Sequence, residues 1–200
     1  MIVKSRQGSI CAVAMLALAF VCAPAMANHL SPNVLVDPSF EDPGAFTTDG
    51  APFIGSWEAF AGSANASSTR VTTMPRTGAE HVDLTIDGDD GSFAGVFQAV
   101  AVTPGQRVNA GIWHKTPNTG LLGVGPEFRI EFHPGDAGGE ISRVENNGVI
   151  PTDEYSLIDI VGAVAPAGAT QARIVYAIQT FGGEPHGGVS SIGTVFLDDA

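Results

Sequence analysis

The sequence predicts an all-β protein, an antiparallel β-sandwich formed by one domain. Three observations favour this fold class. After residue 27 no stretch keeps a helical period, because Gly or Pro interrupts almost every run. Short segments instead alternate apolar and polar residues, as Val82, Leu84 and Ile86 do with Asp83 between them. Turn signals such as Asn146-Asn147-Gly148 separate these segments, and many short strands at such spacing are typical of a sandwich or barrel.

The elements follow from this period of two, taken in chain order. The expected strands are 33–36, 53–60, 70–73, 81–86, 93–102, 108–113, 128–133, 141–145, 155–164, 173–179 and 194–198. Long loops are expected at 44–51 and 182–188, which are rich in Gly and turn-forming residues. The acidic segment 87–91 has part of the spacing of a calcium loop, but it lacks the later oxygen ligands and is interpreted as a solvated turn.

The first 27 residues have the pattern of a cleaved signal peptide. Lys4 and Arg6 form a basic start, an apolar run covers 10–22, and Ala25-Met26-Ala27 supplies small residues for the peptidase. The apolar run is shorter than the about 20 residues that span a bilayer. We therefore expect residues 1–27 to be removed and residues 28–200 to form the exported domain, in the periplasm, at the cell surface or secreted.

Charge and motifs exclude several functional classes. The formal net charge of −12 argues against nucleic acid as a partner, because phosphate binding needs clustered Lys and Arg. Both cysteines, Cys11 and Cys22, lie in the signal peptide, so the mature chain has no thiol chemistry and no disulfide. No nucleophile, zinc or phosphate-binding motif is present, and the chain is not expected to be an enzyme.

Several short motifs occur in a recognisable order. They are Asn33–Glu41, Gly55-Ser56-Trp57, Thr77–Val82, Val96–Gly105, Ala110–Lys115 and Val195–Asp199. This ordered set resembles carbohydrate-binding modules of families 4, 9 and 22. The resemblance implies a galactose-binding-like jelly roll and a non-catalytic function, with a polysaccharide or cell-surface glycan as partner. Two alternatives stay open: a surface or extracellular-matrix structural protein of the same fold without a sugar site, and a small glycan-processing enzyme.

The resemblance also implies a structural Ca²⁺ that ties the opening motif to the closing one. Carried onto this chain, it names Glu41 and Asp198 as ligands. A hard cation takes six to eight oxygens, and two carboxylates from opposite ends of the chain would stabilise a fold without disulfides. The alternative is that both are ordinary surface acids.

Strand alternation predicts a sugar-binding face. Trp57 lies in an apolar stretch and is expected in the core. If the expected strands share one sheet, its outer face carries an aromatic platform and hydroxyl partners, namely Trp113, Asn109, Arg129, Glu131, Arg173 and Gln179. The alternative is an exposed sheet face with one isolated tryptophan.

Overall fold

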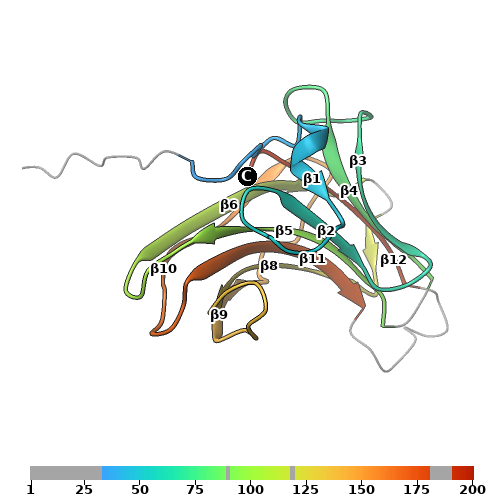
Figure 1. Ribbon diagram of the computed structural model, residues 1–200. Helices are drawn as coiled ribbons and strands as arrows, with labels where there is room; N and C mark the ends of the chain where they lie inside the picture. Colours follow the sequence, from blue (N-terminus) through green and yellow to red (C-terminus); the bar gives the residue numbers. More distant parts are fainter. Residues whose placement is uncertain (1–32, 89–90, 118–119, 181–190) are drawn as a thin grey trace, which may run out of the picture. The chain divides into compact units, whose positions relative to one another are not determined.

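The computed structural model describes residues 33–88, 91–117, 120–180 and 191–200, so the predicted signal peptide and the expected loop at 182–188 lie outside the described residues. The described chain folds into two facing β-sheets, called sheet A and sheet B below (Figure 1). Strand pairing is antiparallel apart from the β1–β2 pair and one isolated bridge. The predicted antiparallel β-sandwich is confirmed.

The strands of each sheet come from distant parts of the chain. From one edge to the other, sheet A contains β1 (Phe46–Thr47), β2 (Trp57–Ala61), β5 (Phe93–Ala101), β11 (Gln171–Thr180), β8 (Val124–His133) and β9 (Ser142–Asn146). Sheet B contains, from one edge to the other, β10 (Ser156–Val164), β6 (Arg107–Lys115), β12 (Ile192–Asp198), β4 (His81–Asp87) and β3 (Ala66–Val71), with β7 (Leu121–Leu122) beside β12. A 3-10 turn, Pro43–Ala45, precedes β1.

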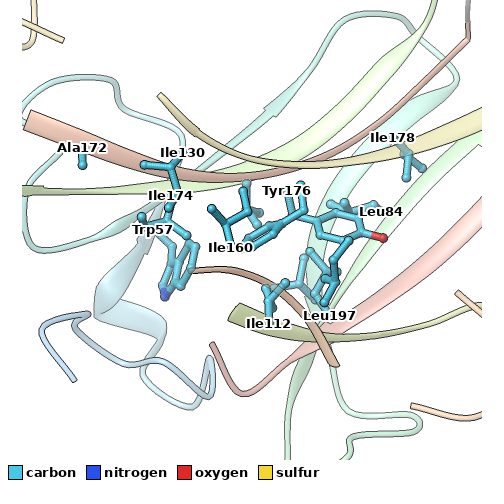
Figure 2. Packing of buried hydrophobic residues seen from close by; sticks show 14 of the residues in the cluster. Trp57, Leu84, Ile112, Ile130, Ile160, Ala172, Ile174, Tyr176, Ile178 and Leu197 are labelled. Carbon is cyan, nitrogen blue, oxygen red and sulfur yellow. The ribbon is translucent and has the colours of Figure 1, made fainter. Parts of the chain in front are cut away.

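The core lies between the two sheets, where alternate residues of each strand meet. Figure 2 shows Ile174 and Tyr176 of sheet A packed toward Leu84, Ile112 and Leu197 of sheet B. All five are 3% exposed or less. Burying a side chain of this size stabilises the fold by roughly 1.5–3 kcal/mol. Trp57 is 1% exposed and belongs to this cluster, as its apolar surroundings predicted.

The structure corrects two predicted elements. Residues 33–36 form no strand; the side-chain amide of Gln98 instead pairs with the backbone of Val36, accepting from its N–H at 2.7 Å and donating to its carbonyl at 2.9 Å. The predicted loop at 44–51 contains β1, and β7 was not expected at all. Both strands have two residues, which is too short for a period of two to be visible.

Consecutive strands repeatedly change sheet along the second half of the chain. β5 lies in sheet A and β6 in sheet B, while β8 and β9 return to sheet A. β10, β11 and β12 then alternate between the two sheets. Neighbours in sequence are therefore often partners across the core rather than within one sheet, and this decides where the predicted site residues lie.

Candidate functional site: the outer face of sheet A

The predicted sugar-binding residues are divided between the two sheets. Arg129 and Glu131 on β8 and Arg173 and Gln179 on β11 share the outer face of sheet A, because β8 and β11 pair directly. Glu131 and Arg173 are opposite each other in register. Trp113 and Asn109 lie on β6 in sheet B. The prediction of one face shared by all six residues is therefore wrong.

Trp113 points outward, as alternation predicted, but an arginine covers one face of its ring. The Arg76 guanidinium carbon lies 3.8 Å from the ring centroid, and Arg76 is held there by an ion pair with Asp199. The side-chain oxygen of Asn109 accepts the N–H of Gly162 at 2.7 Å. The side chains of Trp113 and Asn109 therefore both contact other residues of this chain on the side of sheet B.

A row of phenylalanines crosses the outer face of sheet A instead. Phe53 and Phe97 have ring centroids 5.0 Å apart, and Phe60 lies 6.2 Å from both Phe97 and Phe93. All four rings are partly exposed, and Phe93 is 41% exposed. Partly exposed aromatic rings that lie next to one another on a sheet face are suited to the apolar face of a sugar ring.

Sequence reasoning missed this row, although part of its signal was present. Phe93 and Phe97 occupy the outward positions of a strand whose inward positions are Ala94 and Val96. The register then adds Phe60 opposite Gly95. A side chain at Gly95 would clash, because its Cβ would lie 2.3 Å from the Phe60 ring and 2.7 Å from a backbone oxygen. Gly95 therefore allows Phe60 to lie close against the sheet.

A network of charges occupies β8 beside this row. Arg129 lies between two carboxylates, with Nη1 2.6 Å from Glu127 Oε2 and Nε 2.5 Å from Glu131 Oε1. The second oxygen of Glu131 lies 3.0 Å from His133 Nε2. Burial of Glu131 acts to raise the pKa of its carboxyl, but hydrogen bonds from Arg129 and His133 outweigh it and lower the pKa. The carboxylate is therefore ionised and fixed in place.

Strand β9 extends the network through cross-strand pairs. Arg143 is opposite Glu131 and Glu145 is opposite Arg129, so opposite charges face each other across both pairs. Arg143 Nη1 also lies 3.3 Å from Glu145 and 3.5 Å from Glu127, and its other end contacts Glu140. These contacts raise the pKa of Arg143, chiefly through the hydrogen bond to Glu140.

Two polar side chains of β11 lie between the network and the phenylalanines. Gln179 Nε2 donates to Glu127 Oε2 at 3.2 Å. The Arg173 guanidinium carbon lies 4.6 Å from the Phe53 ring centroid and 5.3 Å from that of Phe97. The structure thus brings Arg129, Glu131, Arg173 and Gln179 together, with the phenylalanine row in place of Trp113.

Glu58 lies at the far side of the row, opposite Phe97 in register. Its Oε1 accepts the N–H of Gly50 at 3.0 Å, while Oε2 is buried without a hydrogen bond. Burial raises the pKa of this carboxyl, the Gly50 hydrogen bond opposes the rise, and Asp49 adds to it.

The two residues named for calcium hold a loop of sheet B. Glu41 Oε1 accepts N–H groups of residues 79 and 80 at 2.9 and 3.1 Å. Asp198 Oδ2 accepts N–H groups of residues 76 and 77 at 2.7 and 3.0 Å, and its Oδ1 accepts that of Asp199 at 2.9 Å. Burial raises the pKa of Asp198, against the lowering effect of these hydrogen bonds.

The groups around the Glu41 and Asp198 carboxylates are hydrogen-bond donors, which stabilise an anion. N–H groups point at the carboxylate oxygens, whereas calcium requires further oxygen atoms around it. Within the described ranges, no group of three or more His, Cys, Asp or Glu side chains is placed to hold a metal. Calcium binding by Glu41 and Asp198 stays a prediction that no finding tests.

Comparison with known proteins gives similarity in fold alone. No family model matches the chain, and no curated protein sequence matches it. Among solved structures, the enzymatically active domain of bacteriophage CBA120 tailspike protein 4 is similar at 16% identity and a TM-score of 0.53, over 78% of this chain and 20% of that one. A structure described as showing promiscuous specificity of carbohydrate-binding modules from the β-sandwich superfamily is similar at 13% identity and a TM-score of 0.50, over 82% and 61%.

The fold is that of the β-sandwich carbohydrate-binding modules. The resemblance seen in the ordered motifs is confirmed at this level. TmCBM61 in complex with β-1,4-galactotriose is a further similar structure, with 18% identity and a TM-score of 0.48 over 84% of this chain and 96% of that one. The chain spans a fifth of the tailspike protein and about three fifths of the module structure at a TM-score of 0.50. Of the described residues, none forms a helix of the length and apolar character needed to cross a membrane.

Proposed function

We propose that this chain is an exported, non-catalytic protein that binds a poly- or oligosaccharide on the outer face of sheet A. The observation that carries the proposal is the phenylalanine row 53, 97, 60 and 93 beside a strip of oriented hydrogen-bonding groups. The fold supports it, because a module of the same fold at a TM-score of 0.50 is described as carbohydrate-binding.

The outer face of sheet A offers two kinds of contact to a saccharide. Sugar rings have apolar C–H faces, which pack on aromatic rings, and hydroxyl edges, which need donors and acceptors. Phe97 and Phe60 supply the first contact, while Gln179, Arg129 and Glu131 supply the second. Because the ion pairs already hold Arg129 and Glu131 in place, binding costs little side-chain entropy.

The expected affinity is modest. An aromatic contact contributes about 0.5–1.5 kcal/mol beyond the area that it buries. Hydrogen bonds to charged groups contribute roughly 1.5–3 kcal/mol each before the cost of association. These magnitudes place Kd between about 1 mM and tens of µM.

Affinity electrophoresis against soluble β-glucans, xylans and mannans tests the proposal. We expect at least one glycan to retard the parent protein, and Phe97→Ala to abolish the retardation, because Phe97 joins Phe53 and Phe60 in the row. Trp113→Ala is the matched control, since it removes an outward aromatic ring from sheet B. Circular dichroism and the melting temperature show that each variant is folded.

The other outcomes are equally informative. Loss of retardation in Trp113→Ala but not in Phe97→Ala would move the site to sheet B. No retardation by any glycan would favour a structural surface protein of this fold. Release of reducing sugar from a retarding glycan would contradict the non-catalytic part of the proposal.

A further inference from the structure

Among the described residues, the arginines on the outer face of sheet A pair with carboxylates, with one exception. Arg129 pairs with Glu127 and Glu131, and Arg143 pairs with several carboxylates. Arg173 lies on the same face, yet no carboxylate of the described residues forms an ion pair with it. An arginine that the fold leaves without an anion, on a face proposed to bind a ligand, points to an anionic group on that ligand.

The contacts that hold the Arg173 side chain involve few of its N–H donors. Its guanidinium packs against the rings of Phe53 and Phe97, and Nη2 donates to the carbonyl oxygen of Asp136 at 3.1 Å. That is the one hydrogen bond that the guanidinium makes within the described ranges. Nε is buried without an acceptor, and no acceptor of the described residues lies within hydrogen-bond distance of Nη1. Because the Arg173 side chain is partly exposed, the edge carrying Nη1 can be reached by a ligand.

We propose that Arg173 forms a subsite for the carboxylate of an acidic sugar, so that the ligand is a saccharide containing uronic acid residues. This inference rests on the proposed saccharide-binding function. A planar guanidinium matches the two oxygens of a carboxylate, and such charge-assisted bonds are about twice as strong as neutral ones. Phe53 and Phe97 pack against the guanidinium and are partly exposed, so the part of each ring that Arg173 leaves uncovered lies beside the same sugar ring.

The acidity of the whole chain does not outweigh this contact. The formal net charge is −12, which repels a polyanion at long range. At 0.15 M ionic strength, exposed charges beyond about 8 Å are largely screened. Glu127, Glu131 and Glu140 are already engaged with Arg129 and Arg143, and the Asp136 carboxylate accepts a hydrogen bond from Gln171. A direct ion pair between Arg173 and a ligand carboxylate is too short to be screened by salt. This ion pair therefore determines the preference for an acidic over a neutral saccharide.

The experiment compares matched polysaccharides by isothermal titration calorimetry at pH 7 and 0.15 M salt. Glucuronoxylan, polygalacturonate and alginate are each tested beside the carboxyl-reduced form of the same polymer. For at least one pair, we expect the parent to bind the acidic form roughly tenfold more tightly, the size of one charge-assisted hydrogen bond. Arg173→Gln should lose this preference while still binding the reduced polymer.

Two further variants make the result specific. Arg107→Gln is the matched control, because Arg107 lies on β6 of sheet B, where its guanidinium donates to the carbonyl of Gly162 at 3.3 Å. Arg173→Lys keeps the positive charge. It replaces Arg173→Gln as the test variant if the melting temperature shows that Arg173→Gln is not folded. It should retain part of the preference, because an ammonium cannot pair with both carboxylate oxygens in the planar arrangement.

The outcomes separate this proposal from the proposed function. Equal binding of acidic and reduced polymers, unchanged in Arg173→Gln, would overturn the acidic subsite and leave saccharide binding intact. Loss of neutral and acidic binding together in a folded Arg173→Gln would also overturn it, since Arg173 would then be a general contact. Absence of binding to every acidic, reduced and neutral glycan would overturn both proposals.

Discussion

His114 makes stability depend on pH through a single buried imidazole. Its Nδ1 lies 2.7 Å from the Tyr176 hydroxyl across the core, while Nε2 is buried without a partner. Burial lowers the pKa of His114 from 6.5 to about 4. Above pH 6.5 the imidazole is neutral in both folded and unfolded chains. As the pH falls toward 4, His114 is protonated in the unfolded chain before it is protonated in the folded chain. The free energy of unfolding therefore falls by about 3 kcal/mol.

Urea unfolding between pH 7.5 and 4.5 measures this effect. We expect the free energy of unfolding to fall more steeply for the parent than for His114→Gln, which does not titrate. The difference between the two slopes isolates His114 from the carboxyl groups that titrate in the same range. Identical slopes for parent and variant would show that His114 takes up its proton without cost.

At the residue scale, the sequence predicted the orientation of side chains better than their neighbours. Alternation placed Arg129, Glu131, Arg173 and Gln179 outward, and all four lie on one outer face. It also placed Trp113 outward, but the covering Arg76 comes from a loop that no period describes. The phenylalanine row depends on register between β2 and β5, which is set by contacts distant in sequence.

At the element scale, most strands were predictable because each buries one face against the core. The strands expected at 81–86, 108–113 and 155–164 are found at His81–Asp87, Arg107–Lys115 and Ser156–Val164. Their assignment to sheets was not predictable, since a half-buried strand has the same pattern in either sheet. That ambiguity placed Trp113 and Arg129 together in the prediction and on opposite sheets in the structure.

Asp198 gives a prediction for the connection between β12 and the loop before β4. Its two oxygens accept three backbone N–H groups, from residues 76, 77 and 199. We expect Asp198→Asn to destabilise the fold by about 1–3 kcal/mol, because the amide replaces one acceptor with a donor that faces an N–H group. Thermal unfolding in metal-free buffer with chelator measures this loss in the absence of calcium.

The same melting curves test the calcium prediction. A native-state calcium site would make chelator lower the melting temperature of the parent, and Glu41→Gln or Asp198→Asn would remove that response. If chelator leaves the parent unchanged while Asp198→Asn still melts earlier, the carboxylates act by their hydrogen bonds alone. An Asp198→Asn variant that melts like the parent would contradict the stabilisation attributed to the hydrogen bonds of Asp198.

At the scale of the whole molecule, the fold class followed from features that span the chain. After residue 27, Gly or Pro interrupts almost every run that could be helical, and apolar residues recur at a period of two in most expected strands. The order of the motifs carried the resemblance, because the same order of elements folds into the same sandwich. The binding face could not be predicted at this scale, since it is assembled from β2, β5, β8, β9 and β11, which are separated in sequence.

Export of the chain is the prediction that concerns the molecule as a whole. Residues 1–27 combine Lys4 and Arg6, an apolar run and the small residues Ala25 and Ala27. We expect the intact mass of the exported product to match a chain that begins at Asn28. Replacing both Ala25 and Ala27 with Leu should block cleavage, because the peptidase requires small residues there. The mature product then contains no cysteine, so a reductant should leave its melting temperature unchanged. A product that keeps Met1 and stays in the cytoplasm would show that the segment is not a signal peptide.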